Sequence, residues 1–211
     1  MNSYHHKYYS FISEYLNNLN KPNILEFGVG EGVTTKIFLK VCEHKGGSLV
    51  SVDVEDSSSK FNSDNWTFLK CRDDNYEIIK EKIIGKLDVI LLDTLHNPKH
   101  IQKMINEYFK YLKVGGIFLI DGTSWLPYLK KEKRNSFSGE VIMYENFRKI
   151  LEVYYNNVET IDLEFSFQGS GIAKLIKLKE KELLYSKKII ERILSIKNIL
   201  RIIKNNLNFF K

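Results

Sequence analysis

The sequence predicts an α/β fold in which a doubly wound, mostly parallel sheet of seven strands ends in an antiparallel pair. Three observations support this prediction. Short apolar runs alternate with segments of helical periodicity over residues 24–120, the run Leu87–Leu92 is almost wholly apolar, and two later apolar runs are separated by a short polar turn. Alternating strands and helices are typical of parallel sheets with right-handed crossovers, and a tight connection is typical of antiparallel pairing.

Five strands and four helices are expected before residue 121. The almost wholly apolar run Leu87–Leu92 indicates a central strand covered by helices on both faces. Glycine pairs mark the ends of two helices, Gly46-Gly47 after the second and Gly115-Gly116 after the fourth. The expected strands are Ile24–Phe27, Ser48–Val52, Trp66–Leu69, Leu87–Leu92 and Ile117–Ile120, and the expected helices span residues 4–18, 33–43, 74–84 and 98–112.

The pattern changes after Asp121. Residues 122–138 are rich in aromatic and basic side chains and predict a loop, and a helix is expected over residues 139–154. Apolar runs over residues 158–165 and 172–178 then predict two strands joined by Gln-Gly-Ser-Gly at residues 168–171, a connection typical of hairpins. This antiparallel pair completes the seven strands.

Composition limits the classes of protein to which the chain can belong. Its 211 residues suffice for one domain with a sizeable core, and 43% of them are hydrophobic and 27% charged. No apolar run approaches the roughly 18 residues of a membrane-spanning helix, and the first residues do not read as a secretory signal. Cys42 and Cys71 are too few for a disulfide framework and lack metal-ligand spacing. We therefore expect reduced thiols and a cytoplasmic location.

The positive charge belongs to the C-terminal tail. Residues 174–211 contain eleven Lys or Arg and three Glu, so the net charge of +6 leaves residues 1–173 at −2. We expect a main domain over residues 1–179 and a basic amphipathic helix over residues 180–211. Packing on the domain, homodimer formation and peripheral contact with an anionic membrane all remain open for residues 183–210. The apolar positions of the tail are Ile189, Ile193, Ile196, Leu200, Ile203, Leu207 and Phe210.

Residues 24–35, Ile-Leu-Glu-Phe-Gly-Val-Gly-Glu-Gly-Val-Thr-Thr, predict a glycine-rich turn between the first strand and its helix. Such a turn lets a ligand approach bare backbone, and the helix N-terminus offers unpaired N–H groups to an anionic group. The dinucleotide fingerprint needs its third glycine where this chain has Val33, so the turn indicates a nucleoside site of another kind. An acid precedes glycines at alternate positions, and these residues are Glu26, Gly28, Gly30 and Gly32.

Acidic residues end or follow each of the next strands. In open α/β sheets, ligands bind beyond the carboxyl ends of the strands, so these acids are expected to lie near the glycine turn. Asp53 stands 21 residues after Gly32 and can accept hydrogen bonds from both ribose hydroxyls. An Asp also commonly caps the helix after a strand, and Asp74 fits that role best. Capping alone explains less well why four consecutive strand ends carry acids, which are Asp53, Asp73, Asp93 and Asp121.

The E-x-G-x-G-x-G turn and the order of these acids resemble class I S-adenosylmethionine-dependent methyltransferases, over about residues 20–178. Leu-Leu-Asp-Thr-Leu-His at residues 91–96, followed by a helix, Gly-Gly and Ile-Asp, is most similar to the small-molecule and sugar O-methyltransferase branch. The resemblance implies a Rossmann-like sheet and S-adenosylmethionine as cofactor. It implies that the glycines flank the methionine portion and sulfonium, with Glu26 near the amino group, Asp53 on the ribose and Asp73 at the adenine.

The resemblance places the transferred methyl group beside the segment that begins at Asp93, so Asp93 and His96 are the expected catalytic residues. Methyl transfer to a hydroxyl needs the proton removed, and histidine side chains titrate near neutrality, which suits His96 as general base. The alternative is that His96 caps or covers the helix that follows. His100, one turn later, is expected to be exposed or to support the site.

A divalent cation is a further expectation of the resemblance. Several members of the branch bind one at positions that correspond to Asp93 and Asp121, and two carboxylates suit Mg²⁺. Metal-dependent members carry a second acid after the one that ends the fifth strand. This chain has Gly122 there, which weighs against metal binding.

Together these features predict transfer of a methyl group from S-adenosylmethionine to an oxygen, or less favourably a nitrogen, of a small-molecule or sugar or polysaccharide-precursor acceptor. Nucleic acid is not favoured as partner, because the Asn/Asp-Pro-Pro-aromatic motif is absent after the fourth strand. Two alternatives stay open, an NAD-binding oxidoreductase and a nucleoside-binding subunit without catalysis. The acceptor pocket is expected between residues 122–138 and the N-terminal helix. Its candidate stacking residues, for each of which ordinary packing is an equal alternative, are Tyr8, Tyr9, Trp125 and Tyr128.

Overall fold

The structure is a computed structural model that describes residues 3–124, 137–189 and 195–208. Trp125 and Tyr128 therefore lie outside the described residues. The strands are β1 (Asn23–Phe27), β2 (Ser48–Asp53), β3 (Trp66–Lys70), β4 (Leu87–Leu92), β5 (Leu112–Asp121), β6 (Ile161–Ser166) and β7 (Ile172–Lys177). The helices are α1 (Ser3–Asn18), α2 (Val33–Lys45), α3 (Tyr76–Lys80), α4 (Pro98–Tyr108), α5 (Phe137–Asn156) and α6 (Ile196–Asn208), with a 3-10 turn at Phe109–Tyr111.

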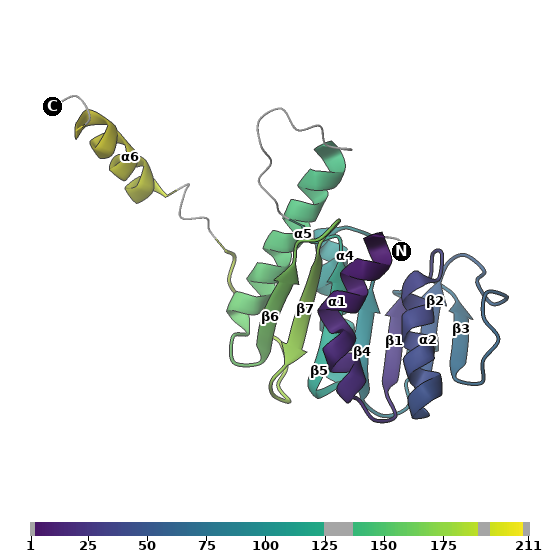
Figure 1. The fold of residues 1–211 in the computed structure, drawn as a ribbon. Coiled ribbons are helices and arrows are strands. Elements are labelled where there is room, and N and C mark those ends of the chain that lie inside the picture. The colour runs from purple at the N-terminus through teal and green to yellow at the C-terminus, as the bar shows by residue number, and fades with distance from the viewer. Residues whose placement is uncertain (1–2, 125–136, 190–194, 209–211) are drawn as a thin grey trace.

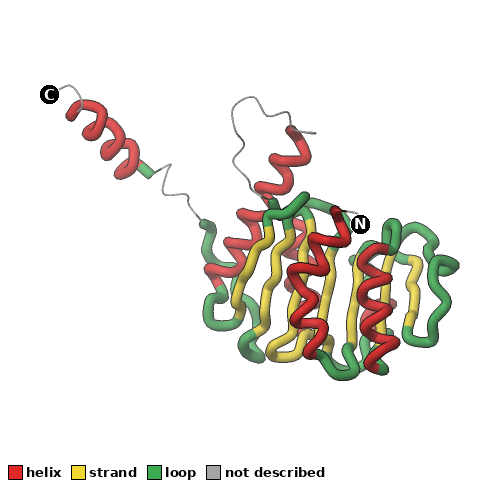
Figure 2. Tube along the Cα trace, viewed as in Figure 1, coloured by secondary structure: helices red, strands yellow, loops and turns green. Residues whose placement is uncertain are grey.

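One seven-stranded sheet organises the molecule, in the order β3-β2-β1-β4-β5-β7-β6. The strands β1 to β5 are parallel, and β7 is antiparallel to both β5 and β6. Figure 1 shows α1 and α2 on one face of the sheet and α4 and α5 on the other, and Figure 2 shows the same layers by type of element. The predicted fold class, a doubly wound sheet with a C-terminal antiparallel pair, is confirmed.

The core consists of two apolar layers, one on each face of the sheet. All six residues of β4 are buried, and they alternate between the layers: Ile90 and Leu92 pack with α4, whereas Val89 and Leu91 pack with α1 and α2. Each fully buried side chain of this kind contributes about 1.5–3 kcal/mol relative to an exposed one. Since β1 and β4 lie at the centre, the two layers hold the carboxyl ends of these strands at one edge of the sheet.

The start of β5 differs from the prediction. The fourth helix ends at Tyr108, and the strand already begins at Leu112, so Gly115 and Gly116 lie inside it. Gly115 has a positive φ of 82°, and the pairing with β4 shifts register between Leu87 and Val89. A Cβ on Gly116 would approach the carbonyl oxygen of Lys113 to 2.9 Å. This glycine pair therefore permits an irregularity in a strand and does not end a helix.

Asp74 was expected to cap the third helix, and this prediction is wrong. The helix α3 begins at Tyr76, and its N-cap residue Asn75 makes no side-chain capping bond. The carboxylate of Asp74 instead accepts from the guanidinium of Arg72, at 2.9 and 3.2 Å, and lies 3.6 Å from the Lys103 amine. Arg72 lowers the pKa of Asp74 to about 2. The carboxylate of Asp74 is therefore engaged by neighbouring cations and does not cap the helix.

The C-terminal tail is helical only in part. The helix α6 spans Ile196–Asn208, whereas residues 181–189 are irregular. Leu183 and Tyr185 pack against the core cluster on the α4 and α5 face. The division into residues 1–179 and 180–211 stays a prediction, although the first part of the tail packs on the domain. Among the described residues, no helix is long and apolar enough to cross a membrane.

Candidate active site

The glycine turn connects β1 to α2 at the carboxyl edge of the sheet. Gly28, Gly30 and Gly32 have φ values of 91°, 47° and 76°, a region that L-residues with a side chain rarely adopt. A Cβ on Gly28 would lie only 2.0 Å from the carbonyl oxygen of Asp93. The glycines therefore allow the turn to bend and to press directly against the end of β4.

Asp53 ends β2 and lies beneath the glycine turn. Its Oδ2 accepts from the backbone N–H of Val29 at 2.8 Å and of Gly30 at 3.2 Å, and its Oδ1 accepts from Glu55 N–H at 3.0 Å. Partial burial raises the pKa of this carboxyl, but the backbone N–H groups outweigh it and hold the pKa below its ordinary value. Asp53 is thus a carboxylate that fixes the turn, and its predicted contact with the ribose stays a prediction.

Glu26 is completely buried behind the turn. Its two oxygens accept hydrogen bonds from the hydroxyls of Thr34 at 2.7 Å, Thr35 at 2.8 Å and Ser51 at 2.6 Å. These bonds join β1 and β2 to the first turn of α2. Burial raises the pKa of Glu26 to about 7, against the three hydroxyls that lower it. The structure shows a supporting role, and contact with the methionine amino group stays a prediction.

Replacing Glu26 with glutamine should change how stability depends on pH. The pKa of about 7 in the folded chain exceeds the ordinary 4.5, so the folded protein keeps a proton that the unfolded chain releases. The stabilisation is fully present below pH 4.5 and is lost as the pH rises to 7, by about 3 kcal/mol in all. Urea unfolding of both proteins across this range should show the wild type losing that amount relative to Glu26→Gln. Parallel stability curves would contradict the assignment.

Asp73 follows β3 and lies in a buried network. Its Oδ2 accepts from the Thr94 hydroxyl and from His100 Nε2 at 2.7 Å, and Tyr108 donates to its carbonyl oxygen at 3.0 Å. The side chains of His100 and Asp73 are only 9% and 10% exposed. His100 therefore supports the site, the second of the two expectations for it. The predicted contact of Asp73 with adenine stays a prediction.

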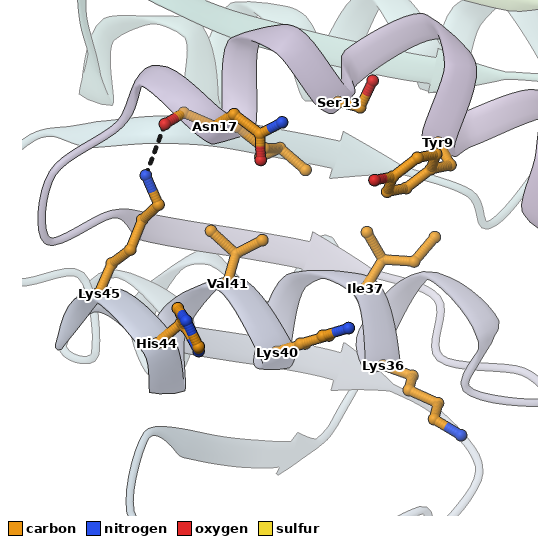
Figure 3. A pocket seen from close by; sticks show the side chains of 10 residues that line it. Tyr9, Ser13, Asn17, Lys36, Ile37, Lys40, Val41, His44 and Lys45 are labelled. Carbon is orange, nitrogen blue, oxygen red and sulfur yellow. Dashed lines mark hydrogen bonds between the residues drawn. The ribbon is translucent and has the colours of Figure 1, made fainter.

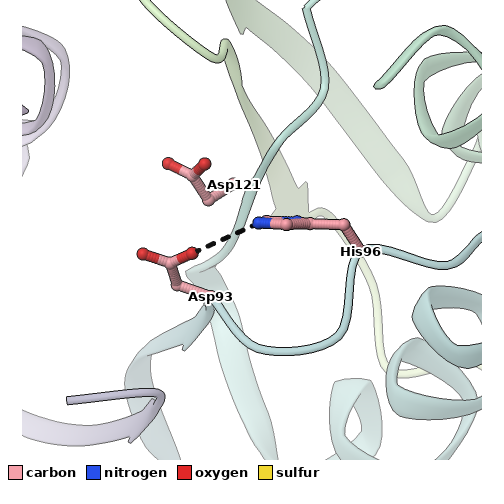
Figure 4. Close-up of side chains that lie close together, drawn as sticks. All are labelled: Asp93, His96 and Asp121. Atoms are coloured by element: carbon pink, nitrogen blue, oxygen red, sulfur yellow. Dashed lines mark ion pairs between the residues drawn. The ribbon is translucent and has the colours of Figure 1, made fainter. Parts of the chain in front are cut away.

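Asp93, His96 and Asp121 come together at the ends of β4 and β5, as Figure 4 shows. One potential ligand atom from each side chain lies within 4.8 Å of the others, and His96 Nε2 is 3.9 Å from Asp93 Oδ1. The His96 side chain is 41% exposed and that of Asp93 is 20% exposed, whereas Asp121 is buried. The cluster thus presents an imidazole to solvent above two carboxylates.

The surroundings of His96 exclude one of its expected roles, that of the cap of α4, and its role as general base stays a prediction. The cap of α4 is Asn97, whose side chain accepts from the N–H groups of Lys99 and His100. His96 lies instead against Gly122, where a Cβ would come within 2.5 Å of its Nδ1. A larger residue after Asp121 would displace the imidazole. His96 is therefore not the cap of the helix, and Gly122 makes room for it beside the acids.

Asp121 is held by residues that the sequence did not connect with it. Tyr8 of α1 donates to its Oδ2 at 2.6 Å, and Ser170 donates to its Oδ1 at 2.8 Å. Tyr8 is 0% exposed, so of its two expected roles, stacking on an acceptor ring and ordinary packing, the structure shows packing. Ser170 precedes β7, which begins beside Asp121. The Gly-Ser-Gly connection could have signalled a polar side chain at this edge, but the sequence offered no sign of Tyr8.

A cavity of about 670 Å³ lies between α1 and α2, as Figure 3 shows. Tyr9, Leu16, Ile37 and Val41 line it, and none of the predicted catalytic or cofactor residues does. Lysines and a histidine surround this apolar floor, namely Lys36, Lys40, His44 and Lys45. We refer to it as the α1–α2 groove. It is distinct from the strand-end cluster.

Residues 25–123 match a family model described as a methyltransferase domain. The SAH-bound methyltransferase PaMTH1 of Podospora anserina has a similar fold, with 15% identity and a TM-score of 0.59, over 80% of this chain and 76% of that one. A Staphylococcus aureus protein described as a proposed caffeoyl-CoA O-methyltransferase gives 13% identity and a TM-score of 0.60, over 84% of each chain. A comparison with curated proteins found no match to the chain.

The MycE methyltransferase of the mycinamycin biosynthetic pathway, solved with Mg, SAH and mycinamycin VI, is 16% identical with a TM-score of 0.58. The match covers 83% of this chain and 49% of MycE, so the chain spans about half the length of that protein. At these identities the similarity shows the fold.

The sheet order is the fold that these methyltransferases share, and the match to a methyltransferase domain covers the glycine turn and the ends of β4 and β5. The matched residues run from within β1 to just past the end of β5, and S-adenosylmethionine as cofactor stays a prediction for this chain. The family match favours methyl transfer over the NAD-binding oxidoreductase, and the nucleoside-binding subunit without catalysis stays an alternative prediction.

Proposed function

We propose that this enzyme transfers the methyl group of S-adenosylmethionine to an oxygen of a small-molecule or sugar or polysaccharide-precursor acceptor. The observation that supports this most directly is the contact between the glycine turn and the end of β4. Gly28 leaves no room for a Cβ beside the Asp93 carbonyl, so the turn and the Asp93–His96–Asp121 cluster are adjacent. A base therefore lies next to the expected sulfonium.

His96 would take the acceptor's proton. As the hydroxyl oxygen attacks the methyl carbon, the carbon–sulfur bond breaks, its electron pair stays on sulfur, and the hydroxyl proton passes to Nε2. Asp93, 3.9 Å from Nε2, would stabilise the resulting imidazolium. An amine attacks through its free lone pair and does not need this base at the moment of attack. The exposed imidazole therefore favours oxygen over nitrogen.

Methyl transfer from S-adenosylmethionine labelled in its methyl group tests this proposal. The full chain would be offered separate panels of sugars, nucleotide-linked sugars and small phenols, with a single-stranded RNA as comparison. We expect label in a hydroxyl compound and none in the RNA. Label in the RNA alone would contradict the proposed acceptor class.

We also propose that Asp93 and Asp121 would hold a divalent cation. The donor set fits Mg²⁺ or Mn²⁺, because two carboxylates converge at the ends of β4 and β5. Such a cation would polarise the acceptor hydroxyl. We assign the proton to His96 and the cation to the carboxylates, since Mg²⁺ prefers oxygen ligands.

Calorimetric titration of the SAH-bound protein with Mn²⁺ measures this binding without activity. We expect a saturable isotherm that Asp121→Asn weakens at least tenfold, because one of two charged ligands is lost. Asp56→Asn, at an exposed carboxylate near β2, should leave it unchanged. If the wild type showed no saturable binding of Mn²⁺, the proposed cation site would be contradicted.

A further inference from the structure

The helix α6 exposes an apolar stripe along residues 196–203. Ile196, Ile199, Leu200 and Ile203 follow each other at spacings of three, one and three, which places them on one face. Their exposed fractions are 77%, 49%, 59% and 49%, and Ile202 beside them is 44% exposed. Figure 1 shows α6 standing apart from the sheet and its covering helices. A contiguous apolar surface that is exposed to water in this way is typical of a surface that binds a partner or a membrane.

The charges beside the stripe are all positive. Lys197, Arg201 and Lys204 recur at spacings of four and three, so they share a flank of the helix next to the apolar face. Arg201 also donates to the Asn198 side chain at 3.0 Å, which holds it on this flank. Residues 195–211 contain no Asp or Glu. The occupant of the stripe should therefore be apolar and bordered by negative charge.

The domain does not offer such a surface in the α1–α2 groove. The groove has an apolar floor, but Lys36, Lys40 and Lys45 border it. A cationic helix from a second copy would meet like charge there. Pairing α6 with itself about a two-fold axis would bring the cations of both copies together as well. Charge therefore argues against a second copy as the occupant.

The tail attaches to the domain at a point close to the start of α6. The amide of Asn157 exchanges hydrogen bonds with Leu184, at 2.9 and 2.7 Å, and that of Asn156 exchanges them with Lys187, at 2.8 and 3.0 Å. The tail is thus fixed to the end of α5 as far as Lys187. Since α6 begins nine residues later, it lies within about 30 Å of this point.

We propose that α6 binds the surface of anionic lipid membranes and so holds the methyltransferase domain beside them. The apolar stripe enters the boundary between head groups and acyl chains, and the three cations contact anionic head groups. The helix lies in the plane of the membrane and does not cross it. This interaction is independent of the acceptor proposed above, because it uses none of the residues of the strand-end cluster.

Vesicle co-sedimentation of the full chain tests the proposal. The vesicles are phosphatidylcholine alone, or equal parts of phosphatidylcholine and phosphatidylglycerol. We expect binding to the mixed vesicles only, weakened by added salt, and weakened about fivefold by Arg201→Gln. The double variant Ile199→Asp with Ile203→Asp should abolish it. Ile84→Asp, at an isoleucine that is 84% exposed on the domain, is the matched control and should bind as the wild type does.

Light scattering of the same proteins and titration with S-adenosylmethionine complete the experiment. We expect an unchanged molar mass and unchanged cofactor affinity in the double variant, which shows that the domain is folded. Two results would overturn the proposal. One is wild-type protein that stays in solution with the mixed vesicles, and the other is a dimer that the double variant dissociates while vesicle binding is absent.

Discussion

Replacing His96 with glutamine is expected to lower kcat by about two to four orders of magnitude at saturating S-adenosylmethionine. Glutamine keeps the polar bulk above Gly122 but cannot take the acceptor's proton. The side chain is 41% exposed at the end of β4, so the substitution leaves the core intact. Steady-state kinetics with the hydroxyl acceptor found in the labelling assay measures the loss, and cofactor affinity should stay within about twofold.

The matched control for this variant is His44→Gln. His44 lies on α2 in the α1–α2 groove and contributes nothing to the strand-end cluster. Its substitution should leave kcat unchanged. A His96→Gln enzyme that retains most of the wild-type kcat would remove histidine from the mechanism.

Asp53→Ala is expected to weaken S-adenosylmethionine binding by about a hundredfold. The substitution removes the acceptor for the N–H groups of Val29 and Gly30 and the carboxylate proposed for the ribose. Hydrogen bonds to a charged group contribute about 1.5–3 kcal/mol each, so losing one or two bonds to the ribose corresponds to an effect of at least this size. Calorimetric titration with the cofactor measures it directly.

Asp56→Ala provides the comparison for Asp53→Ala. Asp56 is three residues away, its side chain is 56% exposed, and it pairs with Ser58 and Lys70 at the surface. Its substitution should not change cofactor affinity. Equal losses of cofactor affinity in Asp53→Ala and His96→Ala would contradict the division between a cofactor-holding turn and a catalytic base.

The fold was predictable because its signals are local and periodic. The apolar run at Leu87–Leu92 identified the central strand, and the turn at residues 28–32 identified the start of α2. Prediction failed at element ends, where two local signals compete. Gly115-Gly116 resembles the end of a helix as much as a strand irregularity, and only the pairing with β4 decides between them.

The sequence predicted which acids lie at the strand ends, but it did not predict the hydrogen bonds that these acids make. The sequence shows that Asp73 and Asp121 end or follow strands, yet it does not show which groups use their lone pairs. Tyr8 reaches Asp121 across 113 residues, and His100 reaches Asp73 across 27. Such contacts depend on how the helices pack on the sheet, which no local pattern encodes. The same holds for Glu26, whose three hydroxyl donors come from α2 and β2.

The most direct test of the proposed function is to identify the atom of the acceptor that receives the methyl group. Reaction of the full chain with S-adenosylmethionine carrying a ¹³C-labelled methyl group gives a product whose carbon resonance distinguishes methyl on oxygen from methyl on nitrogen. We predict an O-methyl resonance that is absent when His96→Gln replaces the wild type. An N-methyl resonance, or an O-methyl product formed equally fast by His96→Gln, would contradict the account.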